Sequence, residues 1–243
     1  MHKEVIGQHE FTFAKSDAND ASLEDIYRLR YQVYCKECNF LRAEDYPDGM
    51  EKDKYDPYSV HFVASDQNGA IGTSRLILYS ELGFPLEEHC NGNLLVDKKT
   101  LPRHNAVEVS RLVISKEYRK RKDDGLYYGP DYVDNQRSEA EHMMKRIRPM
   151  AFGMYREMYQ ESKRRGITHW FAVMEKSLYL LLRMHNFVFH PIGKEFDYYG
   201  PVMPYLADIR EMERTVHEKS PQLWAYFTEG LDPNLILSSH LAN

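Results

Sequence analysis

Charged side chains recur in this 243-residue sequence at places where apolar neighbours predict buried structure. Arg30 falls on a Tyr-rich helical face, Arg75 in the segment GTSRL, and Glu108 and Arg111 in the segment EVSRL with Ser110 between them. Residues 108 and 110 share one face of a strand, so Glu108 and Ser110 are expected to project together. A carboxylate beside a hydroxyl can move protons as general base and acid. Taken singly, each residue also fits a solvated strand face with weak ion pairs.

Two more carboxylates, Asp53 and Asp56, lie in the polar and turn-rich stretch of residues 41–58. With Arg30, Arg75 and Arg111 they would form a cluster of three cations and two anions. Arginine grips a carboxylate with two parallel hydrogen bonds, and a carboxylate pairs with an ammonium group. The cluster therefore suits a substrate that carries both groups, as an amino acid does.

The order of these residues resembles that of the acyl-homoserine lactone (autoinducer) synthases, a branch of the GNAT-like acyltransferases. The shared motifs run from about residue 23 to 115: R-x3-Y at Arg30 and Tyr34, D-x2-D at 53–56, G-x2-R at 72–75, and E-x-S-R at 108–111. The C-terminal half, with PMAFGMYREMY and YYGPVMPYL, resembles a sister family more closely. Those are the acyltransferases associated with the PEP-CTERM/exosortase system, which are similar to N-acyl amino acid synthases, and this resemblance covers nearly the whole chain.

The resemblance implies one GNAT-like α/β domain over residues 1–243, with a mixed central sheet flanked by helices on both faces. It implies an N-acyltransferase that moves a fatty acyl group from acyl-carrier protein to the amine of an amino-acid-like acceptor. Glu108 would be the general base, and Ser110 or a tyrosine would protonate the leaving thiolate. The substrate-binding residues would be Arg30, Tyr34, Phe40, Asp53, Asp56, Arg75 and Arg111.

The sequence leaves alternatives open for the acceptor and for the class of reaction. Tyr34, Phe40 and Ser74 stand where autoinducer synthases have Phe, Trp and, in some members, Trp, which favours an amine other than S-adenosylmethionine. A true autoinducer synthase that uses S-adenosylmethionine is the first alternative. An acetyl-CoA enzyme and a non-catalytic module that binds an acyl chain or a carrier protein are the others.

Two basic clusters bear on the acyl donor. The loop after Ser115 lacks the glycine-rich cradle that would hold the pyrophosphate of CoA at a helix N-terminus. In a chain of net charge −5, basic residues gather instead on both sides of residues 123–144. They would attract the strongly acidic acyl-carrier protein, whose phosphopantetheine thioester would be the co-substrate, and no other cofactor is expected. A solvated basic loop is the alternative. The clusters are Arg119, Lys120, Arg121 and Lys122, and Lys145, Arg146 and Arg148.

Composition excludes several classes. The net charge of −5 and the pI of about 6.1 argue against a dedicated nucleic-acid binder. No run of 18 apolar residues exists, so no transmembrane segment is expected. Three cysteines, Cys35, Cys38 and Cys90, indicate a reducing compartment, and we expect a cytoplasmic protein. Cys35 and Cys38 form one C-x2-C without a second pair, so no metal site is expected.

The elements that must position these residues can be located by pattern. Gln67-Asn68-Gly69 predicts a hairpin between strands at 61–65 and 70–79. A strand is expected at 106–115, and a helix is expected from Ser22. A helix is predicted to begin near Ser138 and to be interrupted by Pro149. The main helix is predicted from Pro149 at its first position to Gly166 just past its end, with Met150, Met154 and Met158 on one face as core or as an acyl-tunnel lining. Further strands are predicted at 10–14, 167–174, 187–192 and 201–209. Further helices are predicted at 178–185, 209–217 and 221–229.

Overall fold

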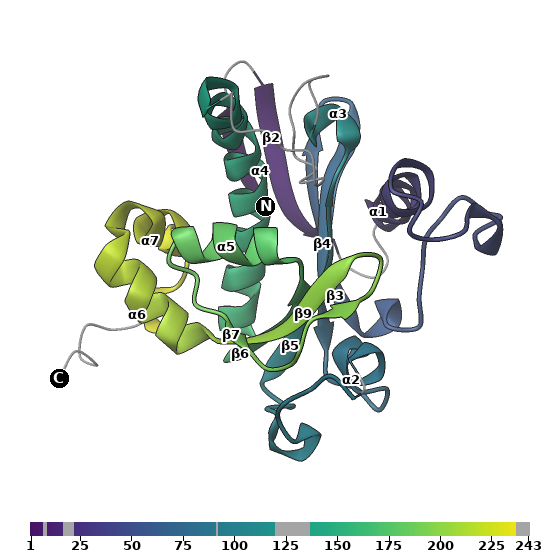
Figure 1. Ribbon diagram of the computed structural model, residues 1–243. Helices are drawn as coiled ribbons and strands as arrows, with labels where there is room; N and C mark the ends of the chain where they lie inside the picture. The colour runs from purple at the N-terminus through teal and green to yellow at the C-terminus, as the bar shows by residue number, and fades with distance from the viewer. Residues whose placement is uncertain (7–8, 17–21, 91, 120–136, 237–243) are drawn as a thin grey trace. The chain divides into compact units, whose positions relative to one another are not determined.

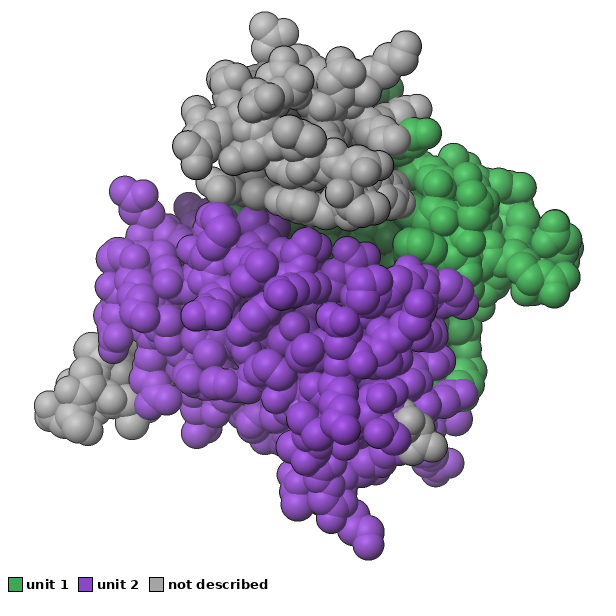
Figure 2. Space-filling view, viewed as in Figure 1, with its two compact units in different colours: residues 1–75, 111–157 green, residues 76–110, 158–243 purple. Residues whose placement is uncertain are grey.

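The computed structural model describes residues 1–6, 9–16, 22–90, 92–119 and 137–236. The chain divides into two compact units, which Figure 2 draws in different colours. Unit 1 comprises residues 1–75 and 111–157, and unit 2 comprises residues 76–110 and 158–243. The expectation of a single domain over residues 1–243 stays a prediction.

Nine strands form one mixed sheet in the order β1-β2-β3-β4-β5-β6-β9-β7, and β8 pairs with β9 (Figure 1). The boundaries between the units fall inside β4, β5 and the helix α4, so these elements contribute residues to both. The strands are β1 (His2–Ile6), β2 (His9–Ser16), β3 (Ser59–Asp66), β4 (Gly69–Leu78), β5 (Ala106–Ile114), β6 (His169–Met174), β7 (His190–Pro191), β8 (Phe196–Asp197) and β9 (Pro201–Asp208).

The helices of the described residues range from single turns to the long α4. The α-helices are α1 (Ser22–Tyr31), α2 (Pro85–His89), α3 (Lys116–Arg119), α4 (Arg137–Arg164), α5 (Lys176–Met184), α6 (Ile209–Lys219) and α7 (Pro221–Thr228). A π-helix, η1 (Gln32–Glu37), directly follows α1. The 3-10 turns are η2 (Ala43–Asp45), η3 (Asp56–Tyr58), η4 (Lys98–Thr100) and η5 (Pro233–Leu235).

Unit 1 is built on antiparallel pairing. β1 pairs with β2 and β2 pairs with β3, the latter from Thr12↔Ser65 to Ser16↔His61. The core cluster on this part of the sheet includes Phe13, which packs directly against α4. At Gly153 a Cβ atom would lie 2.5 Å from the Phe13 ring, so only glycine permits this approach of helix to strand.

Unit 2 contains the parallel pair of the sheet. β5 pairs with β6 from Ala106↔His169 to Val109↔Ala172, and β6 pairs antiparallel with β9. Parallel strands need a crossover connection, and α4 lies between β5 and β6 in the chain. The helices α5 and α6 contact β9, and α2 contacts β6. A core cluster that includes Phe84, Leu86 and Phe171 lies beneath α2.

Most predicted elements are confirmed, and one boundary is wrong. The 67–69 hairpin lies between β3 and β4, α1 begins at Ser22, and Gly166 has a φ of +68° just past the end of α4. Met150, Met154 and Met158 are buried core residues. The helix start expected near Ser138 is confirmed, because α4 begins at Arg137, but the break expected at Pro149 is wrong, because α4 continues through this residue. A proline inside a helix removes one backbone hydrogen bond, and the rest of α4 continues on either side.

Candidate functional site

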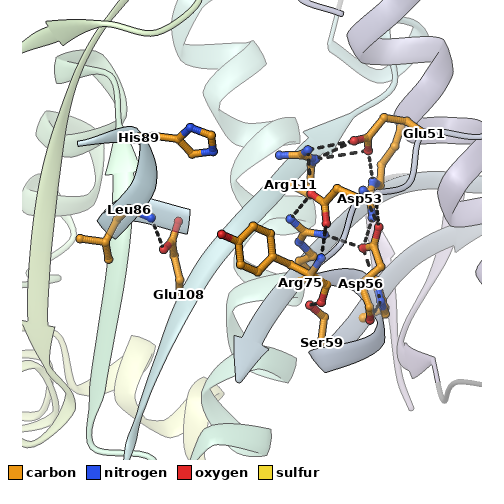
Figure 3. A network of polar contacts seen from close by, with 12 residues as sticks. Glu51, Asp53, Asp56, Ser59, Arg75, Leu86, His89, Glu108 and Arg111 are labelled. Atoms are coloured by element: carbon orange, nitrogen blue, oxygen red, sulfur yellow. Dashed lines mark hydrogen bonds and ion pairs between the residues drawn. The ribbon is translucent and has the colours of Figure 1, made fainter. Parts of the chain in front are cut away.

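A network of six charged side chains forms the polar centre of unit 1. Its cations come from three separate elements: α1, β4 and β5. Its anions come from the segment of residues 51–56, which the sequence marked as a polar loop. Figure 3 shows the contacts between Glu51, Asp53, Asp56, Arg75 and Arg111, and Arg30 completes the network.

Arg30 is the most deeply buried member. Its guanidinium donates to Asp56 twice, from Nη1 to Oδ1 at 2.7 Å and from Nη2 to Oδ2 at 3.1 Å. Its Nε donates to Glu51 Oε2. The Arg30 side chain is 0% exposed, and its guanidinium carbon lies 5.3 Å from the centre of the Tyr27 ring. A charge so placed is held only because carboxylates surround it.

Arg75 bridges the two aspartates of the D-x2-D motif. Its Nη1 donates to Asp53 Oδ1 at 2.8 Å and to Asp56 Oδ1 at 2.5 Å, and its Nη2 donates to Asp53 Oδ2 at 2.7 Å. The backbone N–H of Asp53 also donates to Asp56 Oδ2 at 2.7 Å. The Arg75 side chain is 1% exposed, and its contacts hold Asp53 and Asp56 close to each other.

Arg111 forms the accessible edge of the network. Its Nη2 donates to Glu51 Oε1 at 2.8 Å and to Asp53 Oδ2 at 3.0 Å. The side chains of Arg111 and Asp53 are each 23% exposed, whereas those of Arg30, Arg75 and Glu51 are at most 1% exposed. One cation and one carboxylate of the network are therefore partly open to solvent.

The backbone at Arg111 is unusual for a residue in a strand. Its φ is +51°, in the left-handed region that side-chain-bearing residues rarely adopt. Such conformations persist only where the surroundings enforce them. Here the contacts with Glu51 and Asp53, and the Tyr34 ring 5.3 Å from the guanidinium carbon, fix the side chain.

The π-helix η1 positions the aromatic residues that the sequence assigned to the acceptor. Its wide hydrogen bond runs from the Cys38 N–H to the Val33 carbonyl at 2.9 Å. The Tyr34 carbonyl accepts from Phe40 N at 2.8 Å and from Leu41 N at 3.2 Å, and the Tyr34 and Phe40 rings lie 6.4 Å apart. π-Helical turns occur frequently at functional sites.

The charges of the network shift one another's proton affinities. Burial by itself would raise the pKa of Asp53, but the hydrogen bonds and positive charge of Arg75 outweigh it and hold that pKa well below its usual range. In the same way the arginines hold the pKa values of Glu51 and Asp56 below normal. Burial lowers the pKa of His61, whose Nε2 lies 3.3 Å from the Asp56 carbonyl oxygen. All three carboxylates are therefore ionised at neutral pH.

Glu51 is the network residue that the sequence analysis missed. It turns the expected cluster of three cations and two anions into three arginines and three carboxylates, so the formal charges cancel. A signal was present, because Glu51 stands two residues before Asp53 in the same segment EKDKYD.

Glu108, the expected general base, lies on the part of β5 that belongs to unit 2. Its side chain is buried, and its Oε2 accepts the backbone N–H of Leu86 at 2.9 Å (Figure 3). Phe171 is its cross-strand partner on β6. The negative charge of Glu108 and burial together raise the pKa of Cys90 to about 12, with burial the larger cause. Ser110, two residues further along β5, is partly exposed.

The predicted carrier-protein residues are described only in part. Arg119 ends α3, and Lys145, Arg146 and Arg148 lie on α4, but their side chains lie outside the described set. Lys120, Arg121 and Lys122 lie outside the described residues altogether. Among the side chains that are described, no group of three or more His, Cys, Asp or Glu is arranged to hold a metal ion. None of the described helices is both long and apolar enough to cross a membrane.

Comparison with known proteins identifies the fold. Residues 29–127 match the family model of the acetyltransferase (GNAT) domain. No curated protein sequence matches the chain. The chain has the GNAT-like α/β fold, with a nine-stranded mixed sheet and helices, as the sequence analysis expected.

Three solved structures show the kind of protein that shares this fold. TofI, in a ternary complex with an inhibitor and MTA, superposes with a TM-score of 0.61 at 20% identity over 92% of this chain and 99% of that chain. BjaI, a CoA-dependent acyl-homoserine lactone synthase with SAM and isopentyl-CoA, gives 0.59 at 18% identity over 93% and 92%. FeeM, an N-acyl amino acid synthase from uncultured soil microbes, gives 0.54 at 12% identity over 85% and 95%.

Proposed function

We propose that the chain is an N-acyltransferase that moves a fatty acyl group from a thioester to the amine of an amino-acid-like acceptor. The observation that carries this proposal is the accessible edge of the charge network in a GNAT-like fold. Arg111 offers a guanidinium for a carboxylate, and Asp53 offers a carboxylate for an ammonium. The fold similarity to an N-acyl amino acid synthase and to acyl-homoserine lactone synthases supports the same reaction class.

The reaction assigns a task to each proposed residue. Glu108 takes a proton from the acceptor ammonium, and the neutral nitrogen attacks the thioester carbonyl. The C–N bond forms and the C–S bond breaks. Ser110 or a tyrosine protonates the departing thiolate and regains a proton from the nitrogen as the amide forms. Arg30, Arg75 and Asp56 act by positioning, because their contacts hold Arg111 and Asp53. Tyr34 and Phe40 flank the acceptor.

The experiment for this proposal is a turnover assay with purified protein and a panel of amines, with products identified by mass spectrometry. We expect an N-acyl product from the wild-type chain. Glu108→Gln should lower turnover by about 10²–10⁴-fold, the usual contribution of a general base. It should melt as wild type does, because the glutamine Oε1 can still accept the Leu86 N–H. Unchanged turnover would remove Glu108 from the mechanism, and released MTA would identify SAM as the acceptor.

For the donor we propose acyl-carrier protein. The support is the pair of basic sequence clusters, together with the resemblance to exosortase-associated acyltransferases. The three free cysteines, of which Cys35 and Cys90 are buried, support a reducing and therefore cytoplasmic setting. BjaI is a CoA-dependent enzyme of the same fold, so acyl-CoA is the rival donor.

The charge reversal Arg119→Glu, Arg121→Glu and Arg146→Glu separates the two donors. It should raise KM for acyl-carrier protein whatever the acyl length, and the wild-type advantage should shrink as salt screens the attraction. Equal turnover with acyl-CoA in wild type and variant, at rates above those with the carrier protein, would make CoA the donor.

A further inference from the structure

Helix α2 is short, yet its backbone supplies the described hydrogen bond to the Glu108 carboxylate. A five-residue helix has little stability of its own, so its position must come from tertiary contacts. The contacts on its other side converge on one residue, Glu87, which directly follows the donor Leu86.

Glu87 is gripped by Arg103 in a two-pronged ion pair. Arg103 Nη2 lies 2.5 Å from Glu87 Oε1, and Nη1 lies 3.3 Å from Glu87 Oε2. The same Oε2 accepts the Phe84 N–H at 2.9 Å, which closes the first turn of α2. At Gly83, where φ is +66°, a Cβ atom would lie 2.6 Å from that oxygen, so only glycine leaves room for the turn.

Arg103 is itself fixed on three sides. Its Nη2 also donates to the Lys98 carbonyl at 3.2 Å, and its guanidinium carbon lies 5.5 Å from the centre of the Tyr79 ring. Lys98 in turn donates from Nζ to the Glu87 carbonyl at 2.8 Å. The loop of residues 98–103 thus holds α2 through both the side chain and the backbone of Glu87.

We infer that Arg103, through Glu87 and α2, is a positioning residue that sets the Leu86 N–H against the Glu108 carboxylate. Arg103 does not touch the reacting atoms in this role. Its effect passes through one rigid turn, because Glu87 and Leu86 are consecutive residues of α2. The inference deepens the proposed function, since it rests on Glu108 as the general base.

The surroundings of Glu108 on unit 2 make the hydrogen bond from the Leu86 N–H important. Cross-strand from Glu108 stands Phe171, and the neighbouring apolar cluster includes Phe84 and Ile192. The titratable groups of α2 are Glu87, Glu88 and His89, and the His89 Nε2 lies 3.4 Å from the Tyr198 hydroxyl. Cys90, directly after the helix, stays a neutral thiol at pH 7. Lys98 and Arg103 are the described cations that contact Glu87. In such an apolar setting a hydrogen bond to a carboxylate is strong, and losing its alignment is costly.

The test compares Arg103→Gln and Arg103→Lys with Arg165→Gln. Arg165, which directly follows α4, is the matched control, because its Nε forms a 2.7 Å ion pair with Glu161 Oε1 in the same unit. We expect Arg103→Gln to lower kcat by about 10–100-fold, in keeping with small misplacements of a catalytic group, with KM for both substrates within about twofold of wild type. Arg103→Lys keeps the charge without the two-pronged grip and should fall between.

A second measurement does not depend on turnover. In the wild-type protein the NMR shift of the Leu86 amide should follow the titration of Glu108, which Glu108→Gln identifies by abolishing it. In Arg103→Gln the Leu86 amide should no longer follow that titration, and in Arg165→Gln it should. A wild-type Leu86 response together with wild-type kcat in Arg103→Gln would overturn the inference. So would unfolding of both Arg103 variants, because Arg103 would then be a stability element. If the wild type shows no acyl transfer while the Leu86 response still depends on Arg103, the proposed function fails and the positioning role stands.

Discussion

The charge network of unit 1 and the carboxylate of Glu108 in unit 2 solve the burial of charge in different ways. In the network three arginines and three carboxylates satisfy one another, and all of it except the edge at Arg111 and Asp53 is shut off from solvent. Glu108 instead accepts a backbone N–H beside an apolar cluster. Mutual pairing fixes the ionisation of each network member, whereas the described partner of Glu108 is an uncharged backbone N–H. The difference fits a structural role for most of the network and is compatible with the general-base role that we propose for Glu108.

The strongest way to break this comparison is to remove one buried cation. Arg30→Gln would leave Glu51 and Asp56 as buried anions without their shared partner, and we expect a loss of about 3–5 kcal/mol in the free energy of unfolding. Chemical denaturation measures it. Arg28→Gln is the matched control on the same helix, because its pair with Glu24 is exposed and should contribute less than about 0.5 kcal/mol. Similar small losses in both variants would show that the network contributes little to stability.

A change at the accessible edge should affect binding more than folding. Arg111→Lys keeps the charge but loses the two-pronged grip on a carboxylate, so we expect KM for the acceptor to rise by about tenfold, or about 1.4 kcal/mol. KM for the acyl donor should stay near the wild-type value. Steady-state kinetics with each substrate varied in turn tests this, and an equal rise in both KM values would contradict a specific acceptor contact.

The smallest expected effect sharpens the comparison through pH. Because burial lowers the pKa of His61 below the usual value of about 6.5, the unfolded chain binds a proton there that the folded chain does not. This costs stability as pH falls from about 7 to 5. The network carboxylates have lowered pKa values, so their contribution is present above about pH 4 and is lost only below it. Denaturation midpoints at pH 7 and pH 5 should therefore differ less in His61→Gln than in wild type. An identical pH dependence in His61→Gln and wild type would show that another group causes the loss of stability between pH 7 and pH 5.

Elements with a strong local signal were predictable from the sequence, as were the residues of the four motifs. The hairpin at 67–69 follows from turn chemistry, and β5 follows from its β-branched pattern. Glu51 was missed, although it stands in the same segment as Asp53, because a glutamate in a polar loop is normally solvated and its burial depends on arginines from other segments. The same limit applies to the contact between Leu86 and Glu108, which joins an irregular segment to a strand.

Other differences between the predicted and the observed elements have local physical causes. The π-helix η1 has no distinct composition, because it differs from an α-helix by one extra residue in a turn. Pro149 was expected at the start of a helix because that position tolerates the missing N–H best. In the structure the helical turns on both sides extend through it. β1 was missed because His2–Ile6 (HKEVI) has three polar residues followed by two apolar ones, which is not the alternation of a half-buried strand.

The sequence separation of the residues paired in the charge network has a consequence for the kinetics of unfolding. The network's hydrogen bonds join residues 21 and 26 positions apart from Arg30, and 58 and 60 positions apart from Arg111. The network joins four chain segments, those of Arg30, residues 51–56, Arg75 and Arg111, and each closure costs loop entropy before the ions can pair. We therefore expect the complete network to form late in folding. Interactions absent from the transition state slow unfolding without speeding folding. We therefore expect the network to lower the unfolding rate and so lengthen the lifetime of the native chain.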